Sequence, residues 1–419
     1  VRSTLTRRPM RSCILSKPVA WDLMLLRIEK TIPFPNAINL ARFQKSPELG
    51  PKVLFFSGGS ALRSACSELV RYTHNSIHII TPFDSGGSSA VLRKAFHMPA
   101  IGDIRNRLLA LADKSVQGYP EIFDLFNYRF PRKTAQSKLQ EELNRMIIGK
   151  HKLVKPIPDP MRKIIRQHLD LFDKKKPEDF NLKNASIGNL ILTAGYLQNH
   201  RNFDVIIYIF SALVKVQGIV RPVVNKDLEL AIELEDGSTM VCQHLFSGKE
   251  APPVTSKIRR MGLSDDPQQF QPASVSIRQK MKTLIKQAEL ICYPMGSYYS
   301  SVLANLLPDG VGTAIRKNAC PKVMVPNTTE DPETFGMSLE DQIDHLLKYA
   351  RKDNPRQIKP SDVLNFILLD QNPDFYQGTI RASKYKKLGI EIVQCPLVNS
   401  KSTPLIDDQL FVASLLSFV

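Results

Sequence analysis

Two short segments rich in glycine and serine are the first candidates for chemistry. Residues 57–61, with the sequence SGGSA, lie between an apolar run at 53–56 and a helix predicted by the spacing of apolar residues over 62–70. Glycine lets the backbone approach a ligand closely, and the free N–H groups at a helix start favour an anion. The standard dinucleotide and Walker fingerprints are both missing. Gly58, Gly59 and Ser60 could therefore bind phosphate, and the alternative is a tight turn without a ligand.

The second segment, DSGGSS at residues 84–89, directly follows another apolar stretch at 77–80. Gly86, Gly87 and the three hydroxyls of Ser85, Ser88 and Ser89 could wrap a phosphate or a sugar. Asp84 could hold Mg²⁺, orient a hydroxyl or act as a base. The alternative is a serine-rich turn in which Asp84 caps the next helix. Two such loops after neighbouring strands favour a ligand, because ligands of open α/β sheets lie outside the carboxyl ends of the strands.

Three further segments carry polar groups suited to an anion. In GDIRNR at 102–107, Asp103 fits a helix N-cap, and Arg105 and Arg107 are two apart, so at most one of them should reach a common site. Asn189 heads an apolar helix and could hydrogen-bond a base or a hydroxyl. Residues 296–301, GSYYSS, could give N–H and O–H donors to phosphate, and the alternative is a helix cap with both tyrosines packed in the core.

Strands and helices alternate along most of the chain. Residues 52–81 predict a strand, loop, helix and strand, which implies a parallel sheet. An Asp-Gly turn between two apolar runs predicts a hairpin over 228–241. Later strands are expected at 290–292, 323–325, 366–369 and 390–393, and later helices at 205–214, at 301–307 and from residue 338.

This alternation predicts an α/β fold with a doubly wound, mainly parallel sheet, helices on both faces, and helical and hairpin insertions. Prolines make residues 1–50 an irregular N-terminal extension. Residues 51–419 form the α/β domain, with insertions at about 115–180, which is mostly helical, and at about 247–276, which is a long loop.

Composition excludes several other classes of protein. None of the six cysteines has C-x-x-C spacing and no two histidines have metal-ligand spacing, so neither a zinc site nor a disulfide framework is expected. No apolar run reaches the roughly 18 residues of a membrane span, so we expect a cytoplasmic protein without a membrane partner. The formal net charge is +17. No RNA-binding or helix-turn-helix signature accompanies this charge, so nucleic acid is not an expected partner.

Taken together, the segments resemble the superfamily of CofD, the 2-phospho-L-lactate transferase, and YvcK, the gluconeogenesis factor, with the closest match to the YvcK-like branch. The resemblance runs in the family's order from about residue 52 to the end and rests on FFSGGSAL (55–62), ITPFDSGGSSAVLR (80–93), MPAIGDIRNRLLALAD (98–113), SIGNLIL (186–192), LELAIELEDG (228–237) and GSYYSSVLANLL (296–307).

The resemblance implies a Rossmann-like sheet with a nucleotide-diphosphate ligand over its carboxyl edge. In the transferase branch the ligand is a lactyl-diphospho-guanosine whose phospholactyl group passes, with Mg²⁺, to a deazaflavin. In the other branch, related proteins bind UDP-sugars and influence carbon metabolism and cell shape. Asp84 and Asp103 are then the expected catalytic residues, with Asp84 also the metal ligand. The ligand-binding residues are Gly58, Gly59, Ser60, Gly86, Gly87, Ser88, Arg105, Asn106, Asn189, Gly296 and Ser297.

Two departures bear on catalysis. Ala61 stands where the family's first loop commonly ends in glycine, and Asp84-Ser85 stands where a pair of aspartates is common. The lost carboxylate weakens metal-assisted transfer more than ligand binding. Three hypotheses result: a transferase of a phosphate-linked group, a non-catalytic sensor of a nucleotide-sugar, and, much weaker, a basic nucleic-acid binder. The sequence leaves the choice between monomer and homo-oligomer open.

Overall fold

The computed structural model describes residues 31–113, 119–248 and 250–419. The chain divides into residues Val1–Pro33 and Phe34–Val419, and the helices and strands of the described residues lie in the second unit. Most of the extension expected at residues 1–50, and the first residues of the insertion expected at 115–180, lie outside the described residues. No helix in the described ranges is both long and apolar enough to cross a membrane.

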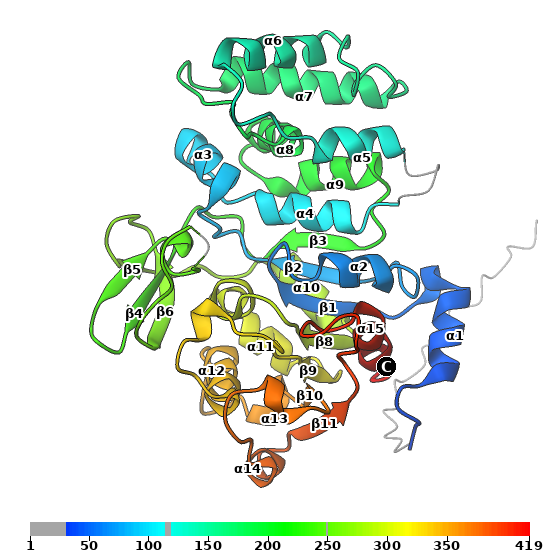
Figure 1. Cartoon of the computed structure of the whole chain (residues 1–419), viewed down its shortest axis with the longest axis vertical. Coiled ribbons are helices and arrows are strands. Elements are labelled where there is room, and N and C mark those ends of the chain that lie inside the picture. Colours follow the sequence, from blue (N-terminus) through cyan, green and yellow to red (C-terminus); the bar gives the residue numbers. More distant parts are fainter. Residues whose placement is uncertain (1–30, 114–118, 249) are drawn as a thin grey trace, which may run out of the picture. The chain divides into compact units, whose positions relative to one another are not determined.

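The centre of the fold is a parallel sheet of seven strands in the order β11-β10-β9-β8-β1-β2-β3 (Figure 1). Every pairing in it is parallel. Its strands are β1 (Val53–Ser57), β2 (Ile77–Ile80), β3 (Ile219–Pro222), β8 (Leu290–Tyr293), β9 (Lys322–Met324), β10 (Phe366–Asp370) and β11 (Glu391–Cys395). The apolar runs at 53–56, 77–80 and 290–292 are therefore buried parallel strands, as predicted.

Side chains alternate between the two faces of the sheet, and helices cover both faces. Along β1, Val53 and Phe55 belong to one hydrophobic cluster, whereas Leu54 and Phe56 belong to the other. The first cluster includes residues of α2 (Arg63–Leu69), α4 (Gly102–Ala110) and α15 (Asp408–Leu416). The second includes residues of α10 (Gln279–Gln287), α11 (Val311–Arg316) and α12 (Leu339–Ala350). This confirms the Rossmann-like α/β fold.

A set of helices separates β2 from β3 in the sequence. The helix α8 contacts α4, α5, α7 and α9, and α6 contacts α7, so the set packs as one layer after another (Figure 1). Besides α4, its members are α3 (Gly87–Phe96), α5 (Pro120–Asn127), α6 (Gln136–Ile147), α7 (Met161–Lys175), α8 (Ile187–Gln198) and α9 (Phe203–Leu213). The mostly helical character expected of 115–180 holds for the described part of that range.

A second, antiparallel sheet has the order β5-β4-β6-β7. It contains the expected hairpin, β4 (Glu229–Leu234) and β5 (Thr239–Val241), together with β6 (Ile258–Ser264) and β7 (Pro272–Ala273). The long loop expected over 247–276 is therefore wrong for 258–264. Arg259 and Arg260 interrupt the apolar pattern of β6, since their side chains are 66% and 54% exposed, whereas Met261 and Leu263 are buried.

Three further sequence expectations need correction. Residues 37–45 form helix α1 (Ala37–Lys45) in spite of the neighbouring prolines, because Asn36 caps it by accepting a hydrogen bond from Asn39 N. Edge strand β3 has no counterpart among the predicted strands, and its terminal proline suits an edge. The helix expected at 301–307 is a π-helical turn, Tyr298–Val302, followed by a 3₁₀ turn, Leu303–Leu306.

The short helices α13 (Pro360–Val363) and α14 (Ala382–Lys387) complete the C-terminal part.

Candidate functional site

A cavity of about 250 Å³ lies where the loops after β1, β2 and β8 meet. Gly59 and Ser60 follow β1, Thr81 and Asp84 follow β2, and Ser300 follows β8. From β1, the strands β2 and β3 extend the sheet to one edge, and the strands β8 to β11 extend it to the other edge. The order in which strands are added therefore reverses between β1 and β8. Open α/β sheets bind their ligands at such a switch point, outside the carboxyl ends of the strands.

Asp103 leaves no space for a side chain at position 59, so this position requires glycine. A Cβ atom there would lie 2.1 Å from Asp103 Oδ1 and 2.9 Å from Asp103 Cα. Asp103 lies in the first turn of α4, where a carboxylate is stabilised by the helix dipole. The N-cap of α4 is Ile101, so the expectation that Asp103 caps the helix is wrong. The carboxylate of Asp103 is thus held against the first glycine loop.

The N-terminus of α3 already binds a carboxylate in this structure. Gly87 N donates to Glu250 Oε1 at 2.8 Å, and a Cβ at Gly86 would lie 2.8 Å from the same oxygen. Gly87 has a φ of +52°, which favours glycine. Asp84 Oδ1 accepts from Gly86 N at 3.1 Å, which closes the turn before the helix, although Gly86 and not Asp84 is the N-cap residue. The second glycine loop therefore presents backbone donors to an anion.

Three side chains that line the cavity are more than nine-tenths buried and retain polar atoms without a hydrogen-bond partner among the described residues. These atoms are Thr81 Oγ1, Asn189 Oδ1 and Arg105 Nε. The Asn189 amide is oriented by Nδ2, which donates to Ser88 Oγ at 3.0 Å. Buried polar groups in native proteins are nearly always paired, so unpaired ones beside a cavity indicate where a ligand or water makes hydrogen bonds.

Two arginine side chains, Arg105 and Arg129, place positive charges beside the cavity. Arg105 Nη1 donates to Ser186 Oγ at 2.8 Å and Nη2 to Asn106 Oδ1 at 2.6 Å. Burial, followed by the charges of Arg129 and Arg63, lowers the pKa of Arg105 to about 10, so it stays charged at neutral pH. Burial also lowers the pKa of Arg129, which lines the same cavity.

Arg107 is fully buried and takes a separate role in positioning the first loop. Its Nη2 donates to Gly58 O at 2.8 Å and its Nη1 to Leu62 O at 3.1 Å. The prediction that only one of Arg105 and Arg107 reaches the site is confirmed, since Arg105 lines the cavity and Arg107 does not.

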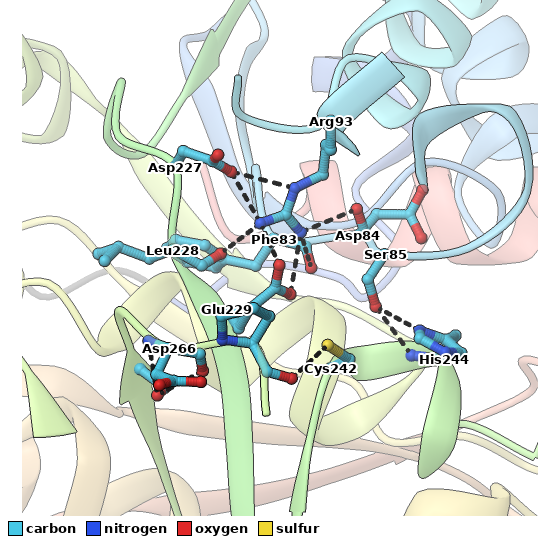
Figure 2. Close-up of polar contacts among 12 residues, drawn as sticks. Phe83, Asp84, Ser85, Arg93, Asp227, Leu228, Glu229, Cys242, His244 and Asp266 are labelled. Atoms are coloured by element: carbon cyan, nitrogen blue, oxygen red, sulfur yellow. Dashed lines mark hydrogen bonds and ion pairs between the residues drawn. The ribbon is translucent and has the colours of Figure 1, made fainter. Parts of the chain in front are cut away.

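Arg93 fastens the second loop to the antiparallel sheet (Figure 2). Its guanidinium is 7% exposed and lies between two carboxylates, with Nη2 2.8 Å from Asp227 Oδ1 and Nη1 3.1 Å from Glu229 Oε2. It also donates at 2.9–3.4 Å to the backbone carbonyls of Phe83, Asp84 and Leu228. Burial raises the pKa of Glu229, and the charge of Arg93 opposes that rise. One arginine thus holds the backbone of Asp84 in place.

A second attachment lies beside the first. Ser85 Oγ is 2.9 Å from His244 Nδ1 and accepts from His244 N at 3.1 Å (Figure 2). His244 belongs to the segment that follows β5, and this segment also supplies Gln243, Ser247 and Glu250 to the cavity wall. The antiparallel sheet therefore completes one side of the cavity.

Most of the residues expected from the sequence come together here. Those that line the cavity are Gly59, Ser60, Asp84, Gly86, Gly87, Ser88, Asp103, Arg105, Asn106 and Asn189. Gly58, Gly296 and Ser297 are not among its lining residues. A Cβ at Gly58 would lie 2.4 Å from Ser301 Oγ, and Gly296 is paired through its backbone with the Asn327 side chain. Tyr298 and Tyr299 are buried in the core, which was the alternative for this segment.

The other half of the cavity wall was not among the individually named site residues. These residues are Thr81, Ser89, Gly102, Arg129, Gln243, His244, Ser247, Glu250, Ser300 and Ser301. Ser89, Ser300 and Ser301 lie in the segments 84–89 and 296–301, which were expected to give donors to phosphate, and Thr81 and Gly102 belong to the quoted motifs. Arg129 and the 243–250 segment carry no local signal, because only the packing of the antiparallel sheet brings that segment to the cavity.

The charges around the cavity are nearly balanced. The carboxylates of Asp84, Asp103 and Glu250 face two arginine side chains, Arg105 and Arg129. In the ranges that the structure describes, no group of three or more histidine, cysteine, aspartate or glutamate side chains is arranged to hold a metal ion. The protein side chains thus leave this cavity slightly acidic, although its backbone donors favour an anion.

Comparisons with known proteins identify the family. The model of the family described as 2-phospho-L-lactate transferase CofD matches residues 53–398. Matching relatives include the gluconeogenesis factors of Listeria innocua, 27% identical over 352 residues (83% of this chain, 89% of the relative), and Bacillus subtilis, 27% identical over 379 residues (87% and 97%). A solved UPF0052-family structure from Bacillus halodurans has a TM-score of 0.62 at 22% identity and covers 88% of this chain and 99% of its own, which concerns the fold alone. Since the family model spans most of the sequence, the chain belongs to the CofD family.

Proposed function

We propose that the protein binds a nucleotide-diphosphate ligand in the cavity at the carboxyl ends of β1, β2 and β8 and transfers a phosphate-linked group from it to an acceptor. The observation that carries this proposal is the hydrogen bond from Gly87 N to the Glu250 carboxylate. An internal anion already lies at the N-terminus of α3, the place where a phosphate oxygen would bind. The unpaired Arg105 Nε and Thr81 Oγ1 supply further hydrogen-bonding capacity for a diphosphate in the same cavity.

Mg²⁺ is the proposed cofactor, and the charge balance supports it. A diphosphate that displaces Glu250 still lies beside the carboxylates of Asp84 and Asp103, and a divalent cation between these carboxylates and the phosphate oxygens relieves their repulsion. Mg²⁺ is usually held by one or two carboxylates together with phosphate oxygens of the substrate. Asp84 and Asp103 would provide those carboxylates, and the cation would offset the negative charge of the diphosphate.

The proposed reaction assigns a role to each charged group. The acceptor's hydroxyl oxygen forms a bond to the phosphorus that carries the transferred group. The bond from this phosphorus to the bridging oxygen breaks, and the nucleoside monophosphate leaves with that electron pair. The hydroxyl proton passes to the Asp84 carboxylate. Arg105 and Arg129 stabilise charge on the phosphate oxygens, as positioning and electrostatics dominate such transfers.

The second candidate is a non-catalytic sensor that binds a UDP-sugar and regulates carbon or cell-envelope metabolism. The names of the gluconeogenesis-factor relatives favour it. Ser85 also stands where a second aspartate is common in the family, and the lost carboxylate weakens metal-assisted transfer more than ligand binding; the Ser85 hydroxyl lies 2.9 Å from His244 Nδ1.

One experiment separates the two functions. The full chain is incubated with Mg²⁺ and nucleotide-diphosphate-linked donors with guanine or uracil bases, and calorimetry and release of nucleoside monophosphate are measured in parallel. Acceptor-dependent release that is lost in Asp84→Asn supports the transferase. Saturable binding without release, for every acceptor tested, supports the sensor. No binding of any donor, with or without Mg²⁺, would refute both.

A further inference from the structure

A second cavity, of about 160 Å³, lies at the end of edge strand β3, beside the start of α9 and the segment that leads into α10. It shares no lining residue with the first cavity. The two are built on neighbouring strands, since Val223 N, just after β3, donates to Ile80 O at the end of β2. The function proposed above leaves this cavity without a role.

The charge of the second cavity is strongly positive. Four cationic side chains line it, and Asp204 is the one carboxylate among its lining residues. Asp204 is shared, with Oδ1 3.4 Å from Arg221 Nε and Oδ2 3.3 Å from Lys280 Nζ. Arg278 and Lys226 also belong to the wall. A single carboxylate cannot balance these charges, so the cavity favours an anion.

Arg221 is the most shielded of these cations, with its side chain 16% exposed. Its Nη1 donates to Val220 O at 3.0 Å, whereas its buried Nε makes no hydrogen bond among the described residues and has only the ion-pair contact with Asp204 Oδ1 at 3.4 Å. Burial lowers the pKa of this guanidinium, and Asp204 opposes the shift. Asp204 shares its charge between Arg221 and Lys280, so an anionic group of a ligand would add hydrogen bonds to the guanidinium and compensate the remaining positive charge.

A second polar group in this cavity is an acceptor. Asn225 Nδ2 donates to Arg201 O at 2.7 Å, which fixes the amide, while Asn225 Oδ1 is buried and has no hydrogen-bond partner in the described part of the chain. A hydroxyl or N–H group of a ligand would match it.

The remaining wall is apolar. Phe203, Val223, Val224 and Met281 line the cavity and are each at least 93% shielded from solvent. An inorganic ion would gain nothing from this wall, whereas the apolar body of an organic anion would remove apolar surface from water. The cavity therefore combines a cationic side, one acceptor and an apolar wall, which is the usual make-up of a small-molecule site.

We propose that the second cavity binds a small organic anion, in which a carboxylate or phosphate group pairs with Arg221 and an attached apolar ring or chain contacts Phe203, Val224 and Met281. The site is separate from the nucleotide-diphosphate site and does not depend on its existence. The same side chains accept either head group, so the class of ligand is defined by the anionic group joined to an apolar body.

The test uses the full chain and four probes, phenyl phosphate, benzoate, inorganic phosphate and phenol, with binding measured by ligand-observed NMR and calorimetry. Phenyl phosphate, benzoate or both should bind at least about tenfold more tightly than inorganic phosphate and phenol, which each lack one half of the ligand. Their relative affinities distinguish a phosphate site from a carboxylate site.

Two variants locate the binding. Arg221→Met, which keeps the length of the side chain, should weaken the better organic anion about tenfold or more, and Arg259→Met, which removes a 66% exposed arginine on β6, should leave it unchanged. Ser276→Trp blocks the exposed edge of the cavity without changing the core and should also abolish binding. The proposal is overturned if neither organic anion binds better than inorganic phosphate, or if both cavity variants bind like the unmodified chain.

Discussion

Replacement of Glu250 by glutamine probes the anion position at the N-terminus of α3. The Glu250 carboxylate accepts from Gly87 N at 2.8 Å and lies against Gly86, within the cavity that the diphosphate is proposed to enter. A phosphate that takes this donor must first displace the carboxylate. Glutamine keeps the size and an acceptor oxygen but removes the charge, so the variant isolates the electrostatic part of the competition.

The expected gain follows from the hydrogen bond that the ligand must break. A hydrogen bond to a charged group contributes about 1.5–3 kcal/mol, and one between neutral groups about 0.5–1.5 kcal/mol. In the unliganded Glu250→Gln protein, the hydrogen bond to Gly87 N is therefore weaker by about 1–2 kcal/mol. The ligand breaks this bond on binding, so binding costs that much less free energy. This corresponds to an affinity for GDP or UDP about 5 to 30 times higher than that of the unmodified chain.

Isothermal titration calorimetry with GDP and UDP, in the presence of Mg²⁺, measures this difference. Glu391→Gln is the matched control, because Glu391 is an exposed glutamate on β11 that does not line the cavity. The control should bind like the unmodified chain. An unchanged or lower affinity in Glu250→Gln would refute the idea that this carboxylate occupies a phosphate position, since loss of a competitor cannot weaken the ligand.

Three further predictions address other parts of the molecule. Asp84→Asn should lower the rate of nucleoside monophosphate release at least about 100-fold, because a general base contributes about 10²–10⁴-fold to a rate. The affinity for GDP should change less than about tenfold. Equal rates in the variant and the unmodified chain would remove Asp84 from the mechanism. Arg93→Met leaves two partly buried carboxylates uncompensated and should cost near the lower end of about 3–5 kcal/mol in urea unfolding, while a loss below about 1 kcal/mol would contradict its role. Hydrogen bonds from Arg381 lower the pKa of Glu340 from its ordinary 4.5 to about 2, so the pair stabilises the fold above pH 4.5 and the contribution is lost as pH falls toward 2. The stability difference between the unmodified chain and Glu340→Gln, which is modest for a surface pair, should shrink over that range, and a difference independent of pH would contradict the assignment.

The sequence predicted those elements whose signals are local. Apolar runs such as 53–56 and 290–292 became buried parallel strands, and the Asp-Gly turn produced the β4–β5 hairpin. The glycine loops were located because glycine and serine directly after a strand mark a ligand-binding edge. The cavity joins both loops with Asp103, Arg105 and Asn189, which lie far apart in the chain.

The sequence could not predict what depends on tertiary packing. Strand β6 was missed because its exposed arginines break the apolar alternation, and β3 because its identity as a strand comes from pairing with β2. Glu250 and His244 reach the cavity only through the antiparallel sheet, which Arg93 and Ser85 attach to the Asp84 loop. Gly296 was expected at the site from the sequence, but it does not line the cavity. Its backbone is instead hydrogen-bonded to the Asn327 side chain.

The most direct test of the central claim is a crystal structure of the protein with GDP and Mg²⁺. We expect the diphosphate beside Ser60 and the N-terminus of α3, with a phosphate oxygen accepting from Gly87 N and with the Glu250 side chain moved away. A complex in which GDP binds elsewhere, while Glu250 stays on Gly87 and the polar atoms of Thr81 and Arg105 stay unpaired, would contradict it.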